Sequence, residues 1–215
     1  MNATRTRLPG KERELQILRA ATAVFARSNY RVASTADIAA AAGIAEPTVF
    51  KYFPTKKSLF LRILDGTGKA ILHVWQRLAS PEATGIDTLQ RIGDTYIEGV
   101  RGHTDELKVQ FQALAESDDP DFARVLRENH EGYVRFFADA IEKGRRDGTI
   151  RPDVDPEAMA WLLNSVGFTS TLLQLLGFGR EKGERQYRAM MDACLSLLAA
   201  PDGPPTTASQ QEVPE

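Results

Sequence analysis

The sequence predicts an all-α protein: an N-terminal three-helix domain followed by a larger helical domain, with about nine helices in all. Two observations predict it. Apolar residues recur at steps of three and four through most of the chain, which is the period of an amphipathic helix. No segment shows sustained strand-type alternation between turn pairs, so we expect almost no strand. The composition, with 42% hydrophobic and 26% charged residues in 215, is typical of a folded globular chain.

We expect three helices near the N-terminus, at about 10–28, 35–42 and 46–52, of which the second and third are short. Ser34, followed three residues later by Asp37, has the pattern of a capping box at the start of the second helix. Gly43 ends that helix, since glycine adopts the left-handed conformation without steric cost. Pro47 suits the first turn of the third helix because its φ is already fixed near the helical value.

Six longer amphipathic helices follow, at about 56–79, 85–101, 104–116, 120–147, 156–178 and 182–199. Thr55 is a good N-cap for the first of them, within which Gly66 and Gly68 are possible weak points. Pro156, after an aspartate, marks another helix start. The expected domains are 1–55, 56–200 and a proline-rich, polar, disordered tail at 201–215.

Residues 158–179 carry no charge and are long enough to span a bilayer. Polar residues such as Asn164, Thr169 and Gln174 interrupt the run, so a helix covered by protein on more than one side is the better interpretation. The first fourteen residues are mostly polar or charged, so we expect no signal peptide. The single cysteine, Cys194, excludes an internal disulfide framework and fits a reducing, cytoplasmic location.

The charge is distributed unevenly along the chain. The formal net charge is −2, yet residues 1–60 hold ten Lys and Arg against four Asp and Glu, a local +6 that leaves −8 for the rest. A basic N-terminal domain on an acidic body indicates that this domain alone meets a polyanion. Two short helices around a glycine turn in such a domain describe a helix-turn-helix. A solvated surface with chance asymmetry is the alternative that charge alone leaves open.

The predicted third helix has one apolar face. Val49 and Phe53 lie four residues apart and can face the core. The residues left on other faces, free to enter a major groove, are Glu46, Thr48, Lys51 and Tyr52. Thr35, at the start of the second helix, is placed to meet a phosphate, and Lys56 can reach the flanking strand.

Residues 34–60 (STADIAAAAGIAEPTVFKYFPTKKSLF) closely resemble the DNA-binding signature of the tetracycline-repressor (TetR) family of bacterial regulators. The helix lengths and the positions of Gly43, Phe53, Lys56 and Leu59 fall in register with it. The remainder resembles the family in architecture alone. The resemblance implies a helix-turn-helix head, an all-helical ligand domain and binding to double-stranded operator DNA.

The resemblance also implies specific DNA contacts. Thr35, Tyr52 and Lys56 fall on phosphate-contacting positions. The positions that face the groove are Glu46, Pro47, Thr48 and Lys51. Phe50 departs from the family, which usually has a Tyr there, so Tyr52 takes part of that hydroxyl's role. Glu46 can accept from a cytosine amino group, or it is simply a solvent-facing helix start.

Specific binding needs two heads about 34–36 Å apart, one turn of DNA. Segments 156–178 and 182–199 carry more apolar residues than one core-facing stripe needs. They predict a homodimer packed as a four-helix bundle, as the family packs. The alternative is that 156–178 forms the centre of a monomer core.

Large aromatic residues on the middle helices predict a cavity for a small apolar or aromatic effector, although each taken singly is ordinary core. They are Trp75, Tyr96, Phe111, Tyr133, Phe137, Trp161 and Phe168. We therefore expect a ligand-responsive transcriptional repressor. The alternatives are an all-helical enzyme and an effector-free architectural DNA binder. We find no catalytic set, cofactor motif or metal spacing, so we expect no enzyme activity, cofactor or metal site.

Overall fold

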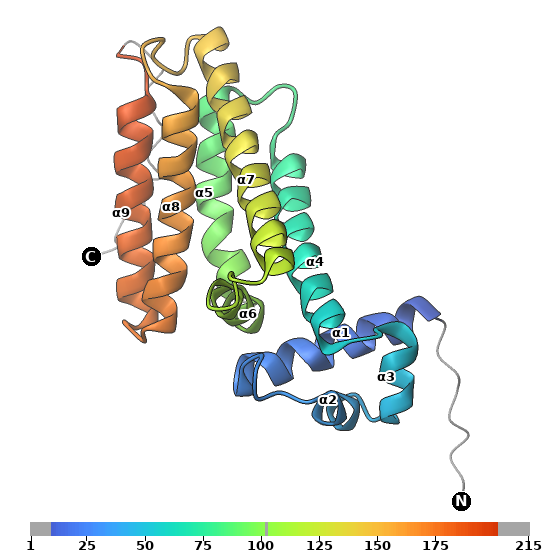
Figure 1. The fold of residues 1–215 in the computed structure, drawn as a ribbon. Helices are drawn as coiled ribbons and strands as arrows, with labels where there is room; N and C mark the ends of the chain where they lie inside the picture. Colours follow the sequence, from blue (N-terminus) through green and yellow to red (C-terminus); the bar gives the residue numbers. More distant parts are fainter. Residues whose placement is uncertain (1–9, 102, 202–215) are drawn as a thin grey trace, which may run out of the picture.

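The computed structural model describes residues 10–101 and 103–201, which are helical apart from connecting segments and a single bridge between Ile150 and Ala199 (Figure 1). The helices are α1 Gly10–Ser28, α2 Thr35–Ala41, α3 Glu46–Tyr52, α4 Lys56–Leu78, α5 Gly85–Arg101, α6 Thr104–Leu114, α7 Pro120–Asp147, α8 Pro156–Leu175 and α9 Arg180–Leu198. The all-α prediction is confirmed. The expected tail lies outside the described residues from 202 onward.

The predicted helix ends rest on the expected chemistry. The Ser34 hydroxyl accepts from the Asp37 N–H, and the Asp37 carboxylate accepts from the Ser34 N–H, which completes a capping box. Gly43 follows α2 with a φ of +63°, and Pro47 lies in the first turn of α3. Thr55 caps α4. Capping residues, glycine and proline therefore determine where the short helices begin and end.

Two later helices end earlier than predicted. The segment expected as 156–178 is helical only to Leu175, because Gly177 and Gly179 adopt φ values of +71° and +82° and turn the chain into α9. Similarly, α6 ends at Leu114 rather than near residue 116. The pattern overestimated α8 because the apolar residues Leu176 and Phe178 continue past its last turn. It overestimated α6 because residues 115–117 follow that helix in tighter turns, in which each N–H bonds to the carbonyl three residues back.

Gly68 is a site of close helix packing and not a weak point. Helix α4 runs without a break through Gly66 and Gly68. A Cβ at Gly68 would overlap the side chain of Asn129 on α7. That side chain lies there because its Nδ2 donates to the Leu64 carbonyl at 3.1 Å. Glycine thus lets α4 and α7 approach closely.

The molecule has two parts, which we call the head (α1–α3) and the body (α4–α9). In Figure 1 the long body helices run side by side, the head lies across their lower end, and α6 lies between the two. Helix α7 contacts α4, α5, α6 and α8, and α9 packs against α8 and α5. The body core is a separate cluster that includes Trp75, Tyr133 and Tyr187.

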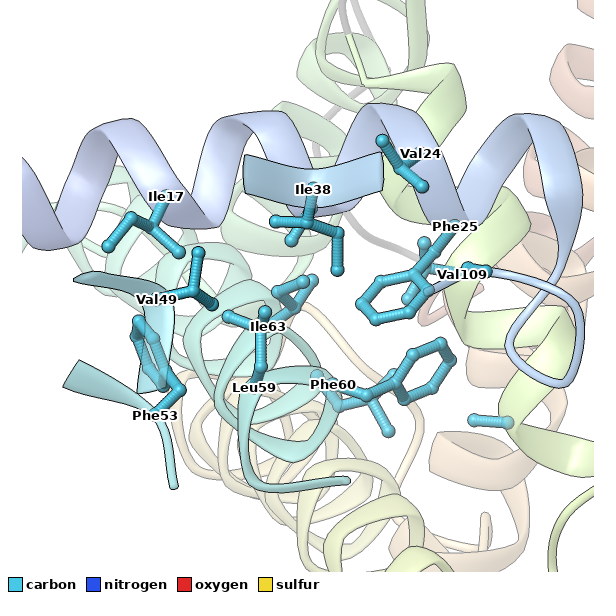
Figure 2. Packing of buried hydrophobic residues seen from close by; sticks show 14 of the residues in the cluster. Ile17, Val24, Phe25, Ile38, Val49, Phe53, Leu59, Phe60, Ile63 and Val109 are labelled. Carbon is cyan, nitrogen blue, oxygen red and sulfur yellow. The ribbon is translucent and has the colours of Figure 1, made fainter. Parts of the chain in front are cut away.

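The core of the head continues into the body. Phe25 of α1 packs edge to face on Phe60 of α4, with ring centroids 4.8 Å apart. Val109 of α6 lies beside them (Figure 2). Phe122 of α7 belongs to the same cluster and packs edge to face on Phe60, with ring centroids 5.5 Å apart. The predicted boundary at residue 55 stays a prediction, but hydrophobic packing crosses it.

Candidate nucleic-acid interface

Helix α3 presents one face to the core and the others to solvent. Val49 is fully buried and points toward Ile17 in the head core (Figure 2). Pro47, Phe50 and Lys51 are exposed on the opposite side. A short rod with a buried anchor and outward side chains is the geometry that a recognition helix needs to enter a major groove.

Phe50 is a residue that the predicted contact set omitted. Its side chain is 45% exposed although it is a large apolar group, and it stands three residues after Pro47 on the same outward face. An exposed aromatic ring there can touch a thymine methyl group in the groove. The sequence indicates this position, because Phe50 directly follows the inward-facing Val49 and successive residues of a helix lie on different faces.

Thr35 and Glu46 are joined to each other. The Thr35 hydroxyl, at the start of α2, donates to the Glu46 carboxylate in the first turn of α3 at 2.5 Å. Both side chains are half-buried. A threonine hydroxyl has only one proton to donate, so a phosphate contact through it requires that this bond be released. In the structure as it stands the pair ties α2 to α3.

Lys56 supports the loop between α1 and α2. Its Nζ donates to the carbonyls of Ala33 at 2.9 Å and Arg31 at 3.3 Å. It also lies 4.9 Å from the centre of the Tyr30 ring. An ammonium group has three donors, so one remains for a phosphate after these two are used.

The other two predicted contacts lie at the edge of the outward face of α3. Thr48 is half-buried. Tyr52 is also half-buried and packs on the head core with its ring. The structure thus brings all seven predicted DNA-contacting residues onto α2, α3 and the start of α4. Pro47 and Lys51 are the most exposed of the set.

Ion pairs connect this surface to the body, at a set of residues that we call the junction. Arg31, in the loop after α1, donates from Nε and Nη2 to the Glu116 carboxylate at 2.7 and 3.2 Å. Lys57 bridges the carboxylates of Asp119 and Asp121 at 2.7 and 2.6 Å. Through Arg31 the junction fixes the head against the loop that joins α6 to α7, and through Lys57 it fixes the start of α4 against that loop and the first turn of α7.

The junction charges favour one another's ionised forms. Hydrogen bonds from Lys57 lower the pKa of Asp119 below its ordinary value, and the two carboxylates raise the pKa of Lys57. The hydrogen bond to Glu116 likewise raises the pKa of Arg31. These basic side chains are engaged by protein carboxylates, so they contribute less to DNA attraction than the net charge of the head implies.

The seven aromatic residues predicted for the effector do not form one group. Trp75, Tyr133 and Phe137 pack together, with ring centroids 4.7–5.3 Å from Trp75. The remaining contacts are two stacked pairs: Tyr96 lies on Tyr187 at 4.8 Å, and Phe111 lies on Phe168 at 4.7 Å. Trp161 is 48% exposed on α8 and stands apart.

Two further features bear on function. Across residues 10–101 and 103–201, no group of three or more His, Cys, Asp or Glu is placed to hold a metal ion. None of the helices in the same ranges is long and apolar enough to cross a membrane. The uncharged segment at 158–179 instead packs against α7 and α9.

Comparisons with known proteins cover most of the chain. The family model of bacterial regulatory proteins of the tetR family matches residues 17–63, and the model of the C-terminal domain of BetI-type transcriptional repressors matches residues 85–199. The chain is 28% identical to the HTH-type transcriptional regulator LuxR of Vibrio harveyi over 90% of its length and 92% of the relative's. It is 24% identical to the HTH-type transcriptional repressor KstR2 of Mycolicibacterium smegmatis over 85% and 90%.

A solved structure shares the fold. The transcriptional regulator FadR of Bacillus subtilis, in complex with stearoyl-CoA, superimposes with a TM-score of 0.76 at 16% identity, over 85% of this chain and 98% of that one. The C-terminal family model alone matches more than half of the chain. The chain therefore belongs to the tetR family of bacterial regulatory proteins, which are DNA-binding transcriptional regulators and not enzymes.

Proposed function

We propose that this regulator is a repressor that binds operator DNA as a homodimer in the cytoplasm and releases it when a small apolar or aromatic effector binds. The observation that carries the proposal is the geometry of α3. Val49 anchors the helix in the core while Pro47, Phe50 and Lys51 project outward. Two relatives bear the printed names of transcriptional regulators, and KstR2 is named a repressor.

The proposed DNA contacts divide by position. Lys51 and Pro47 face the base edges from α3, joined by Phe50. Tyr52, Thr35 and Lys56 meet phosphates, and Glu46 and Thr48 lie beside them. Phosphate contacts position the head on the duplex, whereas groove contacts select sequence. Thr35 exchanges its bond with Glu46 for one with a phosphate.

The proposed dimer forms on α8 and α9. In the single chain α8 has a stripe of exposed large apolar side chains at helical spacing: Trp161, Leu162, Phe168, Leu172 and Leu176, the last just past the helix end. Exposed residues of α9 include Ala189, Ala193 and Leu197, which are small or apolar. A continuous apolar surface of this kind on a helix pair favours association into a four-helix bundle.

The effector site is proposed within the body, among α4–α8. The predicted lining residues Trp75, Tyr96, Phe111, Tyr133 and Phe137 are buried or half-buried there. Trp161 and Phe168 are more exposed than these five residues, so they suit the dimer surface better than the effector site. A ligand with differential affinity for the two head positions shifts the equilibrium toward release. FadR is named in complex with stearoyl-CoA, whose acyl chain is apolar, and this supports a small-molecule effector with an apolar part.

Retention of DNA in a gel tests this function. The purified full chain is titrated onto the DNA that precedes its own coding sequence and onto a shuffled sequence of the same composition, at two salt concentrations. We expect at least a tenfold preference for the upstream DNA and weaker binding at higher salt, because phosphate contacts release counterions. Equal retention of both DNAs, or none, contradicts the proposal.

A further inference from the structure

The hydroxyl of Tyr133, in the middle of α7, is buried without a hydrogen-bond partner. The residue is 6% exposed. Its ring packs against the Trp75 ring, with centroids 5.3 Å apart, and meets the His130 ring edge to face at 5.6 Å. The oxygen itself is closed off from solvent and makes no hydrogen bond of ordinary geometry. Buried polar groups in folded proteins are nearly always paired, so this hydroxyl requires an explanation.

Tyr96 on α5 shows what a satisfied tyrosine looks like in the same region. Its hydroxyl donates to the Gly167 carbonyl of α8 at 2.6 Å and lies 3.0 Å from the Thr171 hydroxyl. Tyr96 is close enough to Tyr133 to contribute to the raised pKa of the Tyr133 hydroxyl. The fold therefore places two tyrosine hydroxyls near each other and supplies protein partners for only one of them.

The groups around Tyr133 are neutral. Burial lowers the pKa of His130 and thus favours its uncharged form. The Asn164 amide nitrogen of α8 lies 3.2 Å from the His130 Nδ1. An amide nitrogen can only donate, so the His130 Nδ1 is the acceptor of this bond. Gln110 of α6 also lies near the Tyr133 hydroxyl. Burial raises the pKa of the Tyr133 hydroxyl, and Gln110 lowers it. Gln110 nevertheless forms no hydrogen bond of ordinary geometry with that hydroxyl.

We propose that the Tyr133 hydroxyl is the hydrogen-bond anchor of the effector site, and that it donates to an uncharged acceptor, such as a ketone or ester carbonyl, on an otherwise apolar molecule. This rests on the proposed function, since it assumes an effector. A neutral acceptor fits because the groups against the Tyr133 ring are an indole and an imidazole, and the side chain near its hydroxyl is the Gln110 amide. A buried carboxylate would instead need a cation to pair with it.

Helix α6 connects the Tyr133 hydroxyl to the head. Helix α6 carries Gln110 near Tyr133 and is also built into the head core through Val109 and Ala113. Gln112 of the same helix donates to the Phe25 carbonyl of α1 at 2.8 Å. Because the hydroxyl is closed off from solvent, an incoming acceptor must displace its neighbours. Displacement of Gln110 moves a helix that is bonded to α1.

Two matched variants test whether the hydroxyl is truly unpaired. Tyr133→Phe removes a hydroxyl without a partner, so we expect the melting temperature to rise by roughly 2–4 °C. Tyr96→Phe removes a hydroxyl that bonds to Gly167, so we expect a fall of similar size. A fall for Tyr133→Phe equal to that for Tyr96→Phe shows that the Tyr133 hydroxyl has a protein partner and overturns the proposal.

Three probes of one shape test the ligand class by calorimetry: 4-phenylcyclohexanone, phenylcyclohexane and 4-phenylcyclohexanecarboxylate. The wild-type protein should bind the ketone roughly three- to tenfold more tightly than the hydrocarbon, and the carboxylate most weakly. In Tyr133→Phe the advantage of the ketone should disappear while hydrocarbon binding persists. This pattern would not follow from a purely structural role of the ring.

Three results overturn the assignment: a preference for the carboxylate, a ketone advantage that survives in Tyr133→Phe, or no binding of the ketone up to its solubility limit. Retention of DNA by the wild-type protein without any probe is measured in parallel. If the probes fail while DNA is retained, the anchor is wrong and DNA binding stands. If DNA retention fails, the proposed function itself is wrong.

Discussion

The head and the body solve the burial of polar groups in different ways. In the head, side chains complete the helix ends and loops: Ser34 and Asp37 cap α2, and Lys56, at the start of α4, holds two carbonyls of the loop before α2. In the body, the hydroxyl of Tyr133 is buried and left unpaired. The difference indicates that the polar groups named in the head are satisfied within the protein, whereas the body leaves a buried hydroxyl for a partner.

The two parts nevertheless share one hydrophobic core, and breaking it should have the largest effect. Phe60→Ala removes a fully buried ring between Phe25 and Phe122. We expect a loss of about 3–5 kcal/mol in the free energy of unfolding. Urea unfolding followed by circular dichroism should show one transition at lower denaturant.

The control for this change is Leu15→Ala on α1, which truncates a side chain that is 52% exposed. Substitutions at such surface positions usually change stability by less than about 0.5 kcal/mol. Two separate transitions in Phe60→Ala, with only one of them shifted, would show that head and body unfold independently.

The outward apolar face of α8 gives the next largest effect. Leu172→Arg places a charge in the middle of the proposed dimer surface, where burial without a partner is costly. We expect dimer affinity to fall on the order of a hundredfold or more, visible by sedimentation as a monomer. Leu114→Arg, at the end of α6, changes a residue of similar exposure and should leave the oligomeric state unaltered.

Two lysines separate DNA reading from support of the head. Lys51→Ala removes an exposed cation from α3 and should weaken binding to upstream DNA by about 1–3 kcal/mol without changing the melting temperature. Lys56→Ala removes the ammonium that bonds to Ala33 and Arg31, so it should lower the melting temperature as well. An equal fall in melting temperature for the two variants would show that Lys51 stabilises the fold rather than contacting DNA.

The junction should give the smallest effect, visible mainly at acid pH. The pKa of Asp119 is lowered in the folded protein by Lys57. Its stabilising contribution is therefore present above the ordinary pKa of an aspartate and is lost as the pH falls through the lowered value. Asp119→Asn should reduce the acid dependence of the melting temperature below about pH 4. If the melting temperature of Asp119→Asn depends on pH as that of the wild-type protein does, the pairing with Lys57 contributes nothing to stability.

The sequence predicted the head more closely than the body for a physical reason. Ser34, Gly43 and Pro47 act on their own helix ends, so a local pattern fixes them. By contrast, the partners of Lys56 are carbonyls more than twenty residues away, and no local pattern indicates them. Aromatic identity alone did not show that Trp161 lies on the exposed face of α8.

The most direct test of the account is a hydroxyl-radical footprint of the full chain on its upstream DNA. Two recognition helices carried by one dimer should protect two symmetric half-sites whose centres lie one helical turn, about 10–10.5 base pairs, or a multiple of it apart. Protection at both half-sites should be lost together in Leu172→Arg. A single half-site, or an intact pair of half-sites in that variant, would contradict the account.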